Sequence, residues 1–202
     1  MNKLLLPLLF STLSTAAWAQ SGDLFVSVGQ SLLSSKGIGS TSATGSTNDL
    51  ELDNGFRFGF RFGFNSEGRT GQEFGYAYNR SQLNFQGASV GGMAIHQGGY
   101  NYLLYATKDG ARFRPFATGG VHFSNFVAPG SSASSGGGST KFGFNYGGGV
   151  KVAVNSKWSV RFDIRQYATP KPNLENSLGV RLFLRDGWMR QLEVSGGFGI
   201  HF

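Results

Sequence analysis

Hydrophobic and polar residues alternate along much of this chain, and the clearest alternation runs from Phe56 to Phe64. Phe occupies every even position of that segment, and Arg or Gly occupies every odd one. Successive side chains of a β-strand point to opposite faces, so five rings share one face and Arg57 and Arg61 share the other. A closed barrel in a membrane suits both faces, with the rings against lipid and the arginines inside. We therefore predict that Phe56, Phe58, Phe60, Phe62 and Phe64 face lipid.

Similar alternation recurs along the chain, in segments long enough for a tilted membrane crossing of roughly 9–11 residues. It predicts strands over residues 22–30, 51–64, 72–83, 93–106, 112–124, 141–154 and 158–167, and an eighth strand that ends at Phe202. Longer connections at 34–48, 84–92, 127–140 and 168–190 alternate with short turns at 65–71, 107–110 and 155–157. This rhythm predicts an all-β fold, an eight-stranded antiparallel up-and-down transmembrane β-barrel, with its short turns in the periplasm.

A secreted soluble β-sandwich is the alternative fold. It requires a second sheet to cover the phenylalanine face, and it would leave Arg57 and Arg61 in bulk water. The barrel explains both faces of the segment, so it is the fold that we predict.

The first residues have the pattern of a secretory signal peptide. Lys3 precedes an apolar stretch at 4–13, and Ala17-Trp18-Ala19 fits the small-x-small cleavage rule. We therefore expect a cleaved signal peptide over residues 1–19 and an outer-membrane β-barrel domain over 20–202; a retained membrane anchor is the alternative. The later sequence has no apolar run of the length that a membrane helix needs.

The composition fits strands whose charge is confined to one face. Charged residues make up only 14% of the chain, which contains 32 Gly and 19 Phe. The formal net charge is +7, but the basic residues are scattered singly rather than clustered. We therefore expect no nucleic-acid partner.

Strand parity assigns a set of charged residues to the barrel interior. Seven cations and three carboxylates share the inward positions, namely Arg57, Arg61, Arg114, Lys141, Lys151, Arg161, Arg165, Glu73, Asp163 and Glu193. One hypothesis is a structural salt-bridge network that fills the narrow interior. The other is a narrow, anion-preferring pore, because the excess cations need water and many inward glycines leave room for it.

The C-terminal strand and several internal motifs carry a family resemblance. Gly197, Ile200 and Phe202 match the C-terminal assembly signal of bacterial outer-membrane barrels, although Gly196 stands where a polar residue is usual. With the motifs Arg114-Pro115-Phe116, Gly147-Gly148-Gly149-Val150-Lys151 and Arg161-Phe162-Asp163-Ile164-Arg165, the chain resembles the small OmpA-like eight-stranded outer-membrane barrel family. The resemblance implies a single-chain barrel, inserted by the outer-membrane assembly machinery and surrounded by outer-membrane lipids. We expect a monomer in the bacterial outer membrane.

One tetrapeptide raises an enzymatic alternative. His122-Phe123-Ser124-Asn125 is similar to the His-x-Ser-Asn motif of outer-membrane lipid A deacylases. A serine nucleophile needs a base and an acid that orients it, yet no Asp or Glu occurs between Asp109 and Asp163. We therefore expect no enzyme. His96 and His201 show no metal-ligand spacing, so we expect neither a metal nor a cofactor.

The external connections at 34–48 and 127–140 are rich in Gly, Ser and Thr. Rigid barrels display such loops, and loops are where contacts with partners are usually made. The sequence therefore predicts a structural or surface-interaction role, with the pore and the hydrolase as alternatives.

Overall fold

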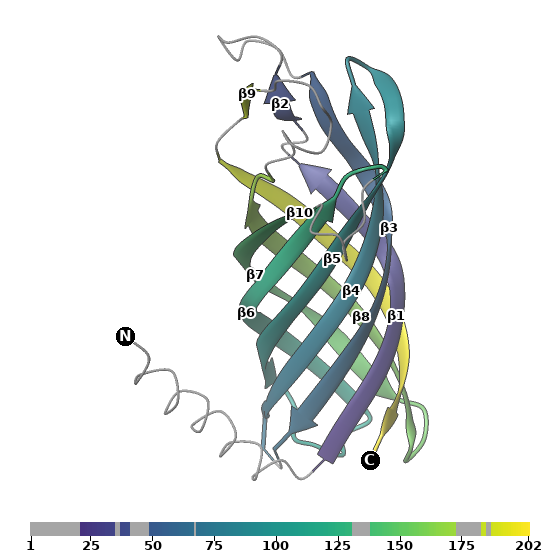
Figure 1. The fold of residues 1–202 in the computed structure, drawn as a ribbon. Helices are drawn as coiled ribbons and strands as arrows, with labels where there is room; N and C mark the ends of the chain where they lie inside the picture. Colours follow the sequence, from purple (N-terminus) through teal and green to yellow (C-terminus); the bar gives the residue numbers. More distant parts are fainter. Residues whose placement is uncertain are drawn as a thin grey trace, which may run out of the picture.

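The computed structural model describes residues 21–34, 37–40, 49–66, 68–130, 138–172, 183–184 and 187–202. Within these ranges eight long antiparallel strands close into a barrel (Figure 1). They are β1 (Ser21–Ser34), β3 (Leu50–Asn65), β4 (Thr70–Phe85), β5 (Ala88–Tyr105), β6 (Phe113–Val127), β7 (Gly138–Ala153), β8 (Trp158–Pro170) and β10 (Trp188–His201). The predicted eight-stranded up-and-down barrel is confirmed. The predicted signal peptide lies outside the described residues.

The barrel closes because β1 pairs with both of the strands that flank it. Phe25 faces Gly199 of β10 on one side and Arg61 of β3 on the other. Every other long strand pairs with its neighbour among the long strands, so the eight strands form a closed ring. Two short strands, β2 (Gly37–Ser40) and β9 (Phe183–Leu184), pair with each other at one end of the barrel. No helix among the described residues is long and apolar enough to cross a membrane.

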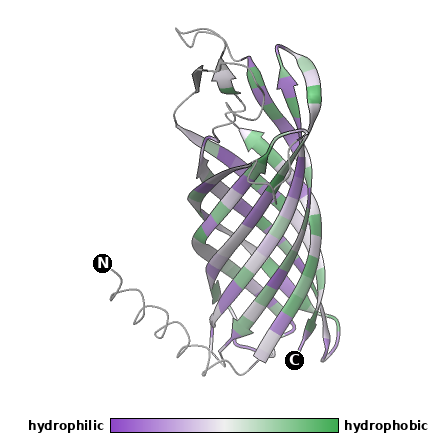
Figure 2. Ribbon diagram, in the orientation of Figure 1, coloured by the Kyte–Doolittle hydropathy of each residue, from purple (hydrophilic) through white to green (hydrophobic). Residues whose placement is uncertain are grey.

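The pleat of the strands sorts side chains between the two faces of the wall (Figure 2). On β3 the rings of Phe56 and Phe60 are 56% and 44% exposed, whereas Arg57 and Arg61 are each 5% exposed. Phe62 is exposed, and Phe58 and Phe64 are half-buried on the same face, packed edge-to-face against Phe60 and Phe62. The structure thus places all five rings on the outer face and the arginines inside.

The two ends of the barrel differ in their connections. The β3–β4, β5–β6 and β7–β8 turns lie at the same end as Ser21 and Phe202, and each is short. Gly22 and Phe202 exchange backbone hydrogen bonds of 2.6 and 2.9 Å there. Short turns are typical of the periplasmic end of outer-membrane barrels, so we expect the opposite end to be extracellular and use these two names for the ends.

The predicted loop at 84–92 is wrong. β4 and β5 continue through this segment as a paired hairpin, in which Phe85 faces Ala88 across a two-residue turn. Gln86 and Gly87 have φ values of 50° and 81°, as a type I′ hairpin turn requires. Asn-Gly is the usual sequence signal for this turn. Here Gln86 takes the place of the Asn, so the sequence does not carry that signal. The hairpin rises above the rest of the wall at the upper right of Figure 1.

We predict that Phe60→Arg, in the middle of the lipid-facing run, will lower the free energy of unfolding by about 2–4 kcal/mol, because it places a cation near the bilayer midplane. The matched control is Phe113→Arg. Phe113 is equally outward, 57% exposed, but lies at the periplasmic start of β6, where the cost falls to about 0–1 kcal/mol. Urea titration in lipid vesicles measures both values, and equal losses would contradict the assigned faces and depths.

Candidate functional site: the barrel interior

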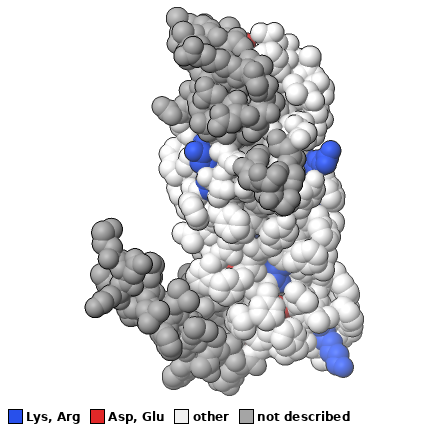
Figure 3. All heavy atoms as spheres, in the orientation of Figure 1, with Lys and Arg blue, Asp and Glu red and all other residues white. Residues whose placement is uncertain are grey.

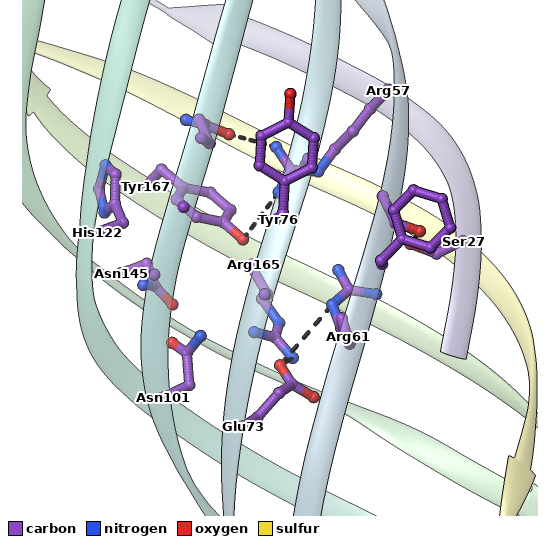
Figure 4. Close-up of a pocket in the computed structure, with 17 residues that line it drawn as sticks. Ser27, Arg57, Arg61, Glu73, Tyr76, Asn101, His122, Asn145, Arg165 and Tyr167 are labelled. Carbon is purple, nitrogen blue, oxygen red and sulfur yellow. Dashed lines mark hydrogen bonds and ion pairs between the residues drawn. The ribbon is translucent and has the colours of Figure 1, made fainter. Parts of the chain in front are cut away.

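Three carboxylates in the middle of the barrel hold four arginines. Figure 4 shows one of the carboxylates, Glu73, beside Arg61 and Arg165. Glu193 accepts from Arg57 at 3.0 Å and from Arg61. Asp163 lies 2.9 Å from both Arg161 and Arg165, its neighbours on β8. Glu73 on β4 binds the same pair from across the barrel, at 2.5 Å and 2.8 Å. All seven side chains are buried, so the charges compensate one another with little help from bulk water.

A neutral layer lies on the extracellular side of this network. Tyr167 donates to Glu193 at 2.9 Å and accepts from Arg57 at 3.1 Å. Gln97 accepts from Arg57 and donates to Ser124 and to Gln191, each at 3.0 Å. Strand parity places these residues inside, but the sequence gives no sign that they would complete the hydrogen bonding of the arginines.

A second charged group lies near the periplasmic end. Asp23 accepts from Lys151 at 2.7 Å and from Asn65 at 2.7 Å, and His201 Nδ1 lies 2.9 Å from its other oxygen. Arg114 donates to Asp109, which belongs to the β5–β6 turn. Neither Asp23 nor Asp109 was among the predicted interior carboxylates.

These two carboxylates change the predicted charge balance. Among the described residues, Asp23, Glu73, Asp109, Asp163 and Glu193 face Arg57, Arg61, Arg114, Lys151, Arg161 and Arg165. The predicted interior set of seven cations and three carboxylates therefore omits two carboxylates, and it overestimates the excess of positive charge. The alternation of β1 contained the signal for Asp23, because Leu24, Val26 and Val28 point outward. Asp109 lies in a turn, where no alternation indicates direction.

Lys141 differs from the other predicted interior residues. It faces the buried Ser124 in register, which places it on the inner face near the extracellular end of β7. Its side chain is half-buried, and no ion pair holds it in the part of the chain that the structure describes. The other nine predicted interior residues are each at most 5% exposed.

An apolar cluster fills the interior at the extracellular end, and we call it the mouth cluster. Its members are each at most 5% exposed: Leu33, Ile38, Leu50, Leu52, Leu83, Met93, Ile95, Phe126, Ala128 and Met189. The cluster depends on a register shift in β3 between Leu52 and Gly55. Below the shift odd positions face inward, and above it the even positions Leu50 and Leu52 do. Strict alternation would have placed both leucines outside.

A small cavity of about 20 Å³ lies in the charged layer. Asn101, His122 and Asn145 point into it from β5, β6 and β7 (Figure 4). Asn145 and the Nδ1 atom of His122 have no hydrogen-bond partner in the described structure. The volume is enough for about one water molecule, which these polar atoms would bind.

The comparison with protein families agrees with this architecture. The family model described as "Outer membrane protein beta-barrel domain" matches residues 5–202. The chain belongs to this family. Because this family consists of outer-membrane barrels, the protein lies in the bacterial outer membrane. A search of curated proteins finds no match.

Solved structures show the same fold at low sequence identity. Neisserial surface protein A is 17% identical, with a TM-score of 0.55 over 90% of this chain and 97% of its own. OprG from Pseudomonas aeruginosa is 18% identical, with a TM-score of 0.55 over 90% and 96%. Outer membrane protein AlkL is 13% identical, with a TM-score of 0.54 over 90% of each chain. Identities this low support the fold alone.

The described interior of this outer-membrane barrel shows no catalytic arrangement around His122 and Ser124. His122 Nε2 lies 2.8 Å from the Thr169 hydroxyl, and Ser124 accepts from Gln97. No carboxylate is hydrogen-bonded to His122 among the described residues, so the orienting acid of a hydrolytic triad is missing.

The C-terminal residues of the barrel are placed at its periplasmic end. Gly197 and Ile200 belong to β10, and Phe202 follows it with a 63% exposed ring. The role of the three residues in assembly stays a prediction.

We predict that Glu193→Gln will lower the free energy of unfolding by about 3–5 kcal/mol, because it leaves Arg57 and Arg61 buried with too little negative charge. The matched control is Lys141→Gln, which removes an interior charge that has no ion pair in the described structure and should change stability by about 0.5 kcal/mol or less. Urea titration in vesicles compares the two variants. Equal small losses would mean that water, rather than the carboxylate, compensates the arginines.

Proposed function

We propose that this outer-membrane barrel has a structural role, as a closed wall that does not conduct ions. The observation that carries the proposal is the mouth cluster, which lies on top of a paired charge network in the same narrow interior. An ion crossing the barrel would have to leave water at fully buried leucine, methionine and phenylalanine side chains. A conducting path would need this cluster to separate.

The argument for an anion-preferring pore is weaker than the sequence suggested. It depended on unpaired interior cations, but Asp23 and Asp109 pair with Lys151 and Arg114. Several of the inward glycines also leave little free space, although a Cβ at Gly63 or Gly75 would meet no atom closer than 3.6 Å. A Cβ at Gly147 would lie 2.2 Å from the Ile164 carbonyl oxygen and 3.1 Å from Arg165 Cγ, so neighbouring groups already occupy that position.

We predict that the purified, folded protein will show no current steps in planar bilayers bathed in concentrated KCl. Heat-modifiable gel mobility verifies that the barrel is folded, and a large-pore porin in parallel bilayers verifies the measurement. Reproducible single-channel steps from the protein would overturn the closed-barrel proposal.

A surface-interaction role is the second candidate, and the β4–β5 hairpin favours it. Among the described residues β5 pairs with β6 only from Ala94 onward, so residues 88–90 pair on one side with β4 and have no described strand along their other edge. Ala88, Ser89 and Val90 are exposed. An exposed strand edge offers unpaired N–H and C=O groups to which an extended segment of a partner can add.

We predict that replacing residues 84–90 by Asn-Gly will abolish any cell binding that this hairpin mediates while leaving the barrel folded. The replacement joins Leu83 to Gly91, which already face one another in register, through a favourable two-residue turn. Binding is measured with bacteria that display either form in equal amounts, and gel mobility monitors folding. Unchanged binding would exclude the hairpin as the contact surface.

A further inference from the structure

The outer wall carries a cation at the extracellular boundary of its lipid-facing surface. The outward positions of β4 run through Phe74, Tyr76 and Tyr78 and then change to Arg80 and Gln82. Arg80 is exposed and faces Phe56 of β3 in register. Phe56 is the ring of the phenylalanine run that lies nearest the extracellular end. Figure 3 shows blue side chains in the upper half and at the lower end of a mostly white described wall, with a further blue patch between them. Arg80 thus lies where the apolar surface of β4 gives way to polar residues.

The wall around Arg80 is hollowed rather than flat. A cavity of about 480 Å³ opens there, with polar and apolar walls formed by Gln30, Asn54, Gly55, Phe56, Arg80, Ser81, Gln82 and Gly92. The guanidinium of Arg80 lies against Gly92 of β5, where a Cβ would come within 2.7 Å of Nε and Nη2. The glycine therefore leaves the space that the guanidinium occupies. Arg80 Nη1 also donates to the Tyr78 hydroxyl at 3.4 Å, which holds the side chain beside the hollow.

The charge of Arg80 has no counter-charge within the described protein. No ion pair joins it to a carboxylate across the described ranges, although six interior cations are paired there. Asp53, which precedes the hollow on β3, accepts from Asn84 at 2.7 Å. A cation beside hydrocarbon is unfavourable unless an anion or water compensates it, so the partner is expected from the membrane surface.

Phosphate is the anion that best fits this arrangement. The planar guanidinium can donate two parallel hydrogen bonds to a phosphate, and the amide of the exposed Gln30 in the wall of the hollow can donate a further bond. The adjoining Phe56 and the tyrosines would contact the acyl chains below such a headgroup. We propose that Arg80 and the polar side chains of this hollow bind the phosphate of a lipid headgroup in the outer leaflet.

The proposal is tested by native mass spectrometry of the folded protein in detergent with bisphosphorylated lipid A as the probe. Arg80→Gln should weaken binding by about tenfold, the loss expected for hydrogen bonds to a charged group. Lys157→Gln is the matched control, because Lys157 is an exposed cation in a turn at the opposite, periplasmic end. It should bind as the wild type does, and circular dichroism with gel mobility verifies that both variants are folded.

Two further arms identify the source of the phosphate. Dephosphorylated lipid A with the same acyl chains should bind the wild type no better than it binds Arg80→Gln. Inorganic phosphate at millimolar concentration should displace little of the bound lipid A. Equal binding of lipid A by the wild type and Arg80→Gln, undiminished binding of the dephosphorylated lipid, or full displacement by inorganic phosphate would each overturn the proposal.

Discussion

The structure depends on one constraint, which is that every backbone N–H and C=O in the hydrocarbon of a membrane must be paired within the protein. A sheet meets this constraint only when its first and last strands join, and β1 makes that junction with β10. Closure then has a second consequence. The pleat sends half of all side chains into an interior that eight strands leave just wide enough to fill.

The charged interior follows from this narrowness. Glu73 on β4 binds Arg161 and Arg165 on β8, which is the strand opposite β4 in the closed order, so these pairs tie the wall together across its diameter. The arginine side chain is long enough to cross the interior, and its guanidinium donates hydrogen bonds in several directions. One guanidinium can therefore bind two carboxylates. Small residues face the long ones: Gly143 leaves space for the His122 ring, since a Cβ there would lie 2.8 Å from its Cε1 atom.

The two ends of the interior are closed by different interactions. At the periplasmic end, Asp109 reaches back from a turn to Arg114 and accepts from Ser21 at 2.5 Å, and Arg114 lies 3.8 Å from the centre of the Tyr105 ring. At the extracellular end the mouth cluster excludes water by apolar packing. The outer wall is correspondingly simple, with aromatic and aliphatic side chains over most of its height and polar side chains where β4 leaves the membrane. Such a barrel is a rigid support for whatever its extracellular segments contact.

The amino-acid sequence by itself determined the strand faces, the number of strands and the location of the protein. These properties depend on alternation and segment length, which are local and which the lipid makes strict. It also indicated which charged residues of the regular strands face inward. Tertiary structure alone decided which charges meet, because Glu193 binds Arg61 from 132 positions away. It also decided that Asp109 folds back from a turn, that a register shift turns Leu50 and Leu52 inward, and that β4 and β5 continue as a hairpin beyond the wall. Each of these depends on contacts between strands, and the period of a single strand carries no information about them.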